Sequence, residues 1–452
     1  MDQVNASAKA QNTPMEVLLR IKNYLIKDPV LLEHLSWNKE GLCIYRSAGA
    51  RDSGLVETKV FWNEAEKYGR YLGGTSSLET YLEKGESRLM KDLEVKERPA
   101  KPEQTQKETP LEGFRIALDP GHVGGTMDFG RLEKKFVRIK KGNRPEITQT
   151  ISFNEGNLAL ATALILRDSL EKLGAVVHIT REKEGHTAFD VSFREWCENK
   201  ADSVEALLGI KWSNGAKTAD GYPARWRNGV AWAYVHQENI TGKDSLWWMT
   251  EATMRDIYRI PFLKADFKQR ANEINDFNPH FTFVIHYNIW EKNTWSSGKY
   301  LNAIDDNFGM AFVPGSFMAG ELGKPEHRMA FLRKAFSDDV PESVELSNAV
   351  IEGYEKYLEV PIIPYDTSLR YLRAASLPTE AEGVFARNLS LTRLIDGPIC
   401  FGEALYQDNV DECIRLNKKT LKLPGMTTLV PLRLIDAVNA YLHGALIYAK
   451  QY

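Results

Sequence analysis

The chain has few cysteines, and none is spaced for a structural metal cluster. Its four cysteines are Cys43, Cys197, Cys400 and Cys413, so no Cys-x-x-Cys pair exists. A structural zinc cluster is therefore not expected. Cys400 lies in an apolar run, where a cysteine is most simply a small hydrophobic residue. A disulfide between Cys400 and Cys413 is an alternative that the sequence leaves open.

Long apolar runs and long basic runs are also missing. Because no stretch of about eighteen apolar residues occurs, we expect no transmembrane helix. A net charge of −3 without a basic run gives no support for nucleic-acid binding. The start, Met-Asp-Gln-Val-Asn-Ala-Ser-Ala, has neither the basic nor the apolar region of a secretory signal peptide. A mature protein without its leader and a cytoplasmic protein both fit this observation.

The overall composition is that of an ordinary globular protein. A chain of 452 residues is long enough for two or three domains. Residues 1–14 are polar and expected to be disordered. Residues 15–93 are expected to form a small N-terminal domain of unknown role. Residues 94–112 are charged, contain proline and have few apolar side chains, which is typical of a linker. The main domain is then expected over 113–452.

Predicted strands and helices alternate from residue 114 onward, which favours an α/β fold. We therefore expect a mostly parallel sheet flanked by helices, with a small α+β domain at the N-terminus. The predicted strands span 114–118, 175–180, 281–285 and 398–402, and the predicted helices span 156–173, 266–277, about 343–357, and 431–449.

Three polar side chains follow the predicted strands where each strand ends. His122 comes after Asp-Pro-Gly at the end of the first strand, His286 ends the strand that begins at Phe281, and Glu403 follows the strand that contains Cys400. In open α/β sheets, ligands bind at the carboxyl ends of the strands. Each residue alone would most simply be a turn or packing residue. Together they predict a site.

Glu155 is the fourth candidate, and the helix that it begins selects it. Ala159 and Ala163 start an apolar stripe at helical spacing, and Glu155 lies four residues before Ala159 on the same stripe. A buried carboxylate is costly unless it is paired or binds a metal. A favourable interaction with the helix dipole is the simpler alternative. Two histidines and a glutamate around an open position are typical of a catalytic zinc site, with a further glutamate as the general base.

Six segments, in the same order along the chain, resemble the zinc-dependent N-acetylmuramoyl-L-alanine amidases of the type-3 family. The match covers roughly 113–182 and 266–450. The segments are Ile116-Ala-Leu-Asp-Pro-Gly-His122-Val-Gly-Gly125, Glu155 with its helix, Gly174-Ala-Val-Val-His-Ile-Thr-Arg181, Arg270-Ala-Asn272, Val284-Ile-His286-Tyr-Asn288, and Phe401-Gly-Glu403-Ala-Leu-Tyr-Gln-Asp-Asn409.

The resemblance implies a peptidoglycan hydrolase of the periplasm or cell envelope, with peptidoglycan or muropeptides as its partners. Zn²⁺ held by His122, Glu155 and His286 would activate a water against the amide bond between N-acetylmuramic acid and L-alanine. Glu403 would be the general base. Asn288 and Trp290 are candidates for substrate binding, and the N-terminal domain is a candidate for binding a regulatory partner. Arg181 and Arg270 are expected to be structural salt-bridge partners.

The chain departs from the family at two residues and in length. Val123 stands where the family usually has glycine, and Val284 stands where it usually has serine. Two insertions are expected, at about 183–265 and 290–341. Eight of the ten tryptophans fall between Trp196 and Trp295, and we expect most of them to pack the first insertion rather than to stack on sugars. An inserted helix that covers the metal is a further alternative.

Two other functions remain open at this point. The same zinc centre would serve a peptidase or another amide hydrolase, because the centre alone does not choose the amide. A cell-wall-binding regulator could also retain the site without turnover.

Overall fold

The computed structural model describes residues 13–65, 98–100, 102, 109–296, 298–365 and 369–451. Most of the expected disordered segment 1–14 and most of the expected linker 94–112 lie outside these residues. All four cysteines lie within them and are free thiols, so no disulfide joins Cys400 to Cys413. Among the described helices, none has the length and hydropathy needed to span a membrane.

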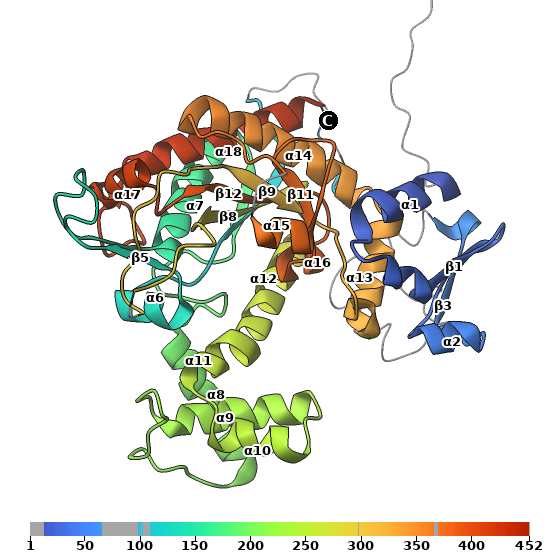
Figure 1. Cartoon of the computed structure of the whole chain (residues 1–452), viewed down its shortest axis with the longest axis horizontal. Helices are drawn as coiled ribbons and strands as arrows, with labels where there is room; N and C mark the ends of the chain where they lie inside the picture. The colour runs from blue at the N-terminus through green and yellow to red at the C-terminus, as the bar shows by residue number, and fades with distance from the viewer. Residues whose placement is uncertain are drawn as a thin grey trace, which may run out of the picture.

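A sheet forms the centre of the molecule (Figure 1). It has seven strands in the order β10-β11-β9-β12-β8-β4-β7. Four neighbouring strands are mutually parallel: β12 (Ile399–Tyr406), β8 (Phe281–Asn288), β4 (Arg115–Pro120) and β7 (Val176–Ile179). These are the four strands that the sequence predicts. The expected mostly parallel sheet flanked by helices is confirmed.

The other three strands extend the sheet beyond β12. β9 (Met310–Val313) pairs antiparallel with β12, β11 (Val384–Arg387) pairs parallel with β9, and β10 (Ser376–Pro378) pairs antiparallel with β11. Segment 290–341, expected as an insertion, therefore supplies a strand to the central sheet. Two smaller sheets lie beside it, β5 (Phe136–Ile139) with β6 (Ile151–Asn154), and β13 (Lys419–Leu421) with β14 (Val430–Pro431).

Helices cover both faces of the sheet. On one face lie α7 (Glu155–Lys172), α14 (Asp339–Gly353) and α18 (Arg433–Gln451), which share one large apolar core with the strands. On the other face lie α12 (Leu263–Phe277) and α16 (Ser390–Leu394). The last helix buries one face against the sheet, formed by Leu434, Val438, Tyr441, Ala445 and Tyr448. Short helices complete this part: α6 (Met127–Glu133), α15 (Arg370–Ala375) and α17 (Val410–Asn417).

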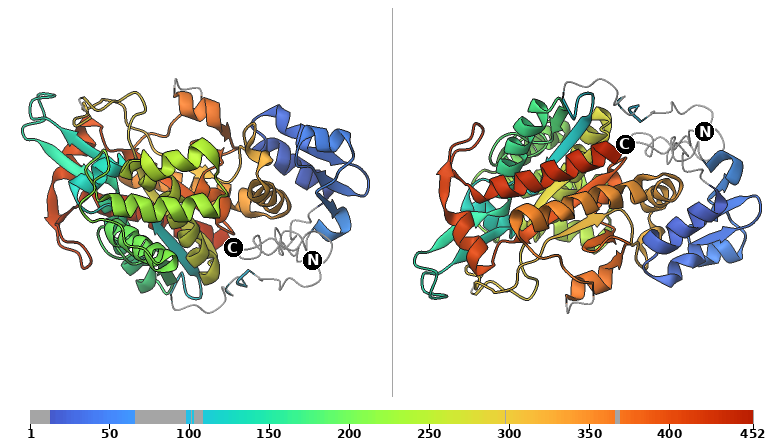
Figure 2. Two further views of the ribbon diagram at one scale, coloured as in Figure 1. Left: turned by 90° about the horizontal axis from the view of Figure 1, so that it is seen from below. Right: turned by 90° about the horizontal axis from the view of Figure 1, so that it is seen from above.

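Residues 13–65 form a small α+β unit at one end of the molecule (Figure 2). Its elements are α1 (Pro14–Arg20), η1 (Ile21–Leu25), η2 (Pro29–His34), β1 (Leu35–Trp37), β2 (Gly41–Ile44), α2 (Ala48–Asp52), β3 (Thr58–Phe61) and η3 (Trp62–Glu64). Its core is continuous with one face of α13 (Pro325–Phe336), since Val17 and Leu25 share a cluster with Phe331. Arg20 adds an ion pair to Asp338 at 2.7 Å. Segment 290–341 thus also anchors the N-terminal unit.

The segment 183–265 forms a group of helices that projects from the sheet domain (Figure 1). It contains α8 (Phe193–Leu208), α9 (Ala224–Gln237), α10 (Gly242–Thr250) and α11 (Met254–Ile257), followed by η4 (Tyr258–Phe262), which leads into α12. Trp196, Trp226 and Trp248 are buried in its own core. These three tryptophans pack the segment, as expected for most of the tryptophans in this region.

Candidate metal centre

His122 follows β4 in a strained backbone conformation. Its φ is 60°, in the left-handed region that residues with a Cβ rarely adopt. The preceding Gly121 donates its N–H to the carbonyl of Ile285 at 2.9 Å, which places it beside β8. A Cβ on Gly121 would overlap the imidazole of His286. Glycine is therefore needed here for space, and it brings the two histidines together.

Arg270 holds the backbone of the His122 loop. It donates to the carbonyl of Pro120 at 2.8 Å and to that of His122 at 2.9 Å. It also forms ion pairs with Asp119 at 3.2 Å and Asp266 at 2.7 Å. All three charged side chains are buried. Such a network over-determines the loop, which allows the strained conformation of His122 to persist.

Arg181 braces the same loop from the other side. It donates to the carbonyls of Pro120, Gly121 and Gly156 at 3.2, 2.9 and 2.8 Å. The expected structural role therefore fits both arginines. Arg270 forms the expected salt bridges. Arg181 instead donates hydrogen bonds to backbone carbonyls, because its guanidinium group points at the turn.

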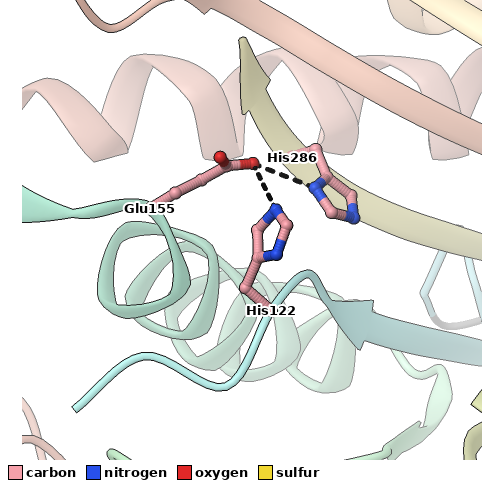
Figure 3. Close-up of side chains that lie close together, drawn as sticks. All are labelled: His122, Glu155 and His286. Carbon is pink, nitrogen blue, oxygen red and sulfur yellow. Dashed lines mark hydrogen bonds and ion pairs between the residues drawn. The ribbon is translucent and has the colours of Figure 1, made fainter. Parts of the chain in front are cut away.

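Glu155 begins α7 and reaches both histidines (Figure 3). Its Oε1 lies 3.0 Å from His122 Nε2 and 2.9 Å from His286 Nδ1. Its side chain is fully buried, and burial alone would favour the neutral acid. His122 and Lys135 outweigh burial and hold the pKa of Glu155 well below its usual range. A carboxylate anion therefore stands at the centre of the group.

His286 is fixed by packing on the neighbouring strand. Its ring stacks on Phe401 with centroids 4.4 Å apart and an interplanar angle of 10°. Burial lowers the pKa of His286 to about 4. The imidazole is thus neutral near pH 7, which is the form that binds a metal.

The three side chains fit a divalent metal ion. One ligand atom from each of His122, Glu155 and His286 lies within 4.8 Å of the others. His122 Nε2 is buried and faces Glu155 Oε1 at 3.0 Å, without a well-directed hydrogen bond. Two imidazoles and a carboxylate that converge in this way are the donor set of a catalytic zinc site.

Glu403 lies beside this group. It is the register partner of His286 across β12 and β8, so the two side chains leave the same face of the sheet. Its Oε2 is buried and has no hydrogen-bond partner among the described residues. Burial and the nearby Glu155 raise the pKa of Glu403 to about 8. A carboxyl group that titrates near neutrality is suited to accept and donate a proton.

Three further residues complete the centre, and sequence reasoning missed them. Gln407 donates to Glu155 Oε2 at 3.2 Å, and Lys135 Nζ lies 3.5 Å from the same oxygen. Glu133 Oε1 lies 3.2 Å from His122 Nδ1. Gln407 falls within a motif segment and could have been weighed there. Glu133 and Lys135 lie outside every motif and carry no sequence signal.

The two candidates for substrate binding lie just past His286 on the chain. Asn288 ends β8 and accepts a hydrogen bond from the N–H of Ile289 at 2.9 Å. Trp290 is half-buried, and its backbone N–H donates a hydrogen bond to the side chain of Asp408 at 3.2 Å. Their position is compatible with substrate binding, which remains a proposal.

No family model and no curated protein matches the sequence. The chain is similar in structure to the CwlD amidase from Clostridioides difficile in complex with the GerS lipoprotein, with 15% identity and a TM-score of 0.36, over 75% of this chain and 100% of that one. It is also similar to the N-acetylmuramyl-L-alanine amidase Ami1 from Mycobacterium abscessus, with 13% identity and a TM-score of 0.33, over 75% and 99%.

Proposed function

We propose that this protein is a zinc-dependent N-acetylmuramoyl-L-alanine amidase that cleaves the amide bond between N-acetylmuramic acid and the L-alanine of the stem peptide. The observation that supports this most is the convergence of His122, Glu155 and His286, whose ligand atoms lie within 4.8 Å of one another. These residues, with Glu403 beside them, are the ones that the family motifs select. The substrate would place the protein in the periplasm or cell envelope.

His122, Glu155 and His286 would hold the ion. When bound, Zn²⁺ supplies a Lewis acid for the amide carbonyl and a more acidic water. Glu403 takes the proton of the attacking water and returns it to the nitrogen of the departing L-alanine. Burial and the nearby Glu155 raise the pKa of Glu403 to about 8, and a bound cation would lower this pKa toward the value that a base needs.

Digestion of purified muropeptides by the zinc-loaded protein tests the proposal. We expect liquid chromatography with mass spectrometry to find a free stem peptide that begins with L-alanine, and a glycan with a free lactyl carboxyl group. Cleavage within the stem peptide would instead identify a peptidase on the same scaffold. Binding without any product would identify a regulator.

The variant Glu403→Gln tests the general base. We expect turnover to fall by about 10²- to 10⁴-fold, the usual contribution of general acid–base catalysis, while bound zinc stays unchanged. Glu352→Gln is the matched control, because Glu352 is a largely exposed carboxylate on α14. If Glu403→Gln keeps normal activity, Glu403 is not the base.

A further inference from the structure

Glu133 contacts the nitrogen of His122 that faces away from Glu155. Its Oε1 lies 3.2 Å from His122 Nδ1, whereas His122 Nε2 lies 3.0 Å from Glu155. If Nε2 binds an ion, the proton of the imidazole is on Nδ1, which then donates a hydrogen bond to Glu133. A carboxylate in this place fixes the tautomer and the ring orientation of a metal-binding histidine, and it increases the basicity of the imidazole.

Glu133 is itself held by two other donors on the same oxygen. The hydroxyl of Tyr258 donates to Oε1 at 2.6 Å, and the N–H of Val123 donates to it at 3.2 Å. His122 Nδ1, the Tyr258 hydroxyl and the Val123 N–H thus converge on one oxygen of a buried carboxylate.

Tyr258 belongs to the inserted segment and is fixed by its packing. It is the first residue of η4 and is 1% exposed. Its ring meets Phe129 and Phe193 edge-on, with centroids 5.5 and 5.2 Å away. Phe193 begins α8, so the position of the Tyr258 hydroxyl depends on the inserted helices.

Val123 makes a second connection between the insertion and the His122 loop. This residue follows His122 and stands where the resembling family usually has glycine. It is 1% exposed and belongs to the same apolar cluster as Trp196 and Met254 of the inserted segment. The departure from glycine thus adds a side chain that packs with the inserted helices.

We propose that the inserted segment 183–265 positions the metal ligand His122 through Tyr258 and Glu133, and thereby sets the affinity of the centre for zinc. This inference rests on the proposed function, because it requires His122 to bind a metal. Tyr258 and Glu133 are positioning residues that act through His122. In this proposal the inserted segment supports the metal centre.

Zinc affinity, measured by competition with a chromogenic chelator, tests the inference without relying on activity. We expect Glu133→Gln to bind zinc up to about 100-fold more weakly and Tyr258→Phe about tenfold more weakly. Losses of this size are usual when a residue that hydrogen-bonds a metal ligand is replaced. Tyr234→Phe is the matched control: Tyr234 lies on α9 of the same segment and packs against Trp248. Its affinity should equal that of the wild type. Cobalt-loaded protein should show a changed visible spectrum in the two test variants only.

The outcomes separate the inference from the proposed function. If the wild type binds zinc and both test variants bind it equally tightly, the inference is overturned while the metal centre stands. A loss of thermal stability in Tyr258→Phe at unchanged affinity overturns it as well, since the tyrosine would then be only structural. A wild type that binds no divalent ion overturns the proposed function and this inference with it. If Glu133→Gln fails to fold, the zinc affinity of Tyr258→Phe alone tests the inference, because this variant removes only one hydroxyl group.

Discussion

Replacing Arg270 with methionine removes the side chain that holds the His122 loop. Arg270 is 1% exposed, and its two carboxylate partners, Asp119 and Asp266, are fully buried. The variant would leave both carboxylates without this cation and would also remove the donors to the carbonyls of Pro120 and His122. Breaking a buried ion pair by removing one partner costs about 3–5 kcal/mol. We therefore expect the free energy of unfolding to fall by about that amount.

Denaturation in urea, followed by far-ultraviolet circular dichroism, measures this loss. Lys264→Ala is the matched control, because Lys264 lies on the same helix α12 and pairs with Glu238 at 2.6 Å while its side chain is 53% exposed. An exposed pair of this kind contributes about 0–1 kcal/mol. Arg270→Lys should lie between the two, since a single ammonium cannot reach all four acceptors.

The reasoning fails if Arg270→Met loses less than about 1 kcal/mol, which would place it with the exposed pair. Such a result would mean that other donors replace Arg270 at Asp119 and Asp266. It would also remove the explanation for the left-handed conformation of His122, whose carbonyl Arg270 binds.

Two other perturbations have defined outcomes. Gly121→Ala should weaken zinc binding by at least about tenfold, as loss of a ligand's correct orientation does, because the new Cβ would overlap His286. Gly323→Ala, which meets open space, should leave binding unchanged, and equal affinity of both variants would contradict the steric argument. Burial, with Arg393 and Lys324 nearby, lowers the pKa of His327 from 6.5 to about 3. Below pH 6.5, His327 therefore binds a proton in the unfolded chain but not in the folded chain. The wild type should accordingly lose stability relative to His327→Gln as the pH falls from 6.5 toward 3. Melting temperatures at a series of pH values check this, and a constant difference would refute it.

The strands that carry the candidate ligands could be predicted because local sequence dictates them. β4, β8 and β12 begin as apolar runs, and their carboxyl-terminal halves meet because parallel neighbours share an edge. The structure extends β8 and β12 beyond the predicted ends, so His286 and Glu403 lie within these strands. Glu155 could be selected because helical periodicity places it on the buried stripe of α7. In each case a short window of sequence contains the whole signal.

β9, β10 and β11 could not be predicted in the same way. They are three or four residues long, too short for periodicity to distinguish a strand from a buried loop. What stabilises them is pairing with strands distant in the sequence, as when Phe312 of β9 pairs with Phe401 of β12. The antiparallel edge of the sheet is therefore a result of tertiary contacts, which no local window contains.

The residues that position His122 could not be predicted from local sequence either. Tyr258 and Glu133 lie 125 residues apart, and each has an ordinary local context, a glutamate at the end of a short helix and a tyrosine among aromatic residues. Only the folding of the inserted segment onto the His122 loop brings the hydroxyl to the carboxylate. Motifs identify the side chains that would touch the ion, since their chemistry restricts the residue type. The residues that orient those side chains need only supply a donor or an acceptor at the correct place, and many residue types at many positions can do that.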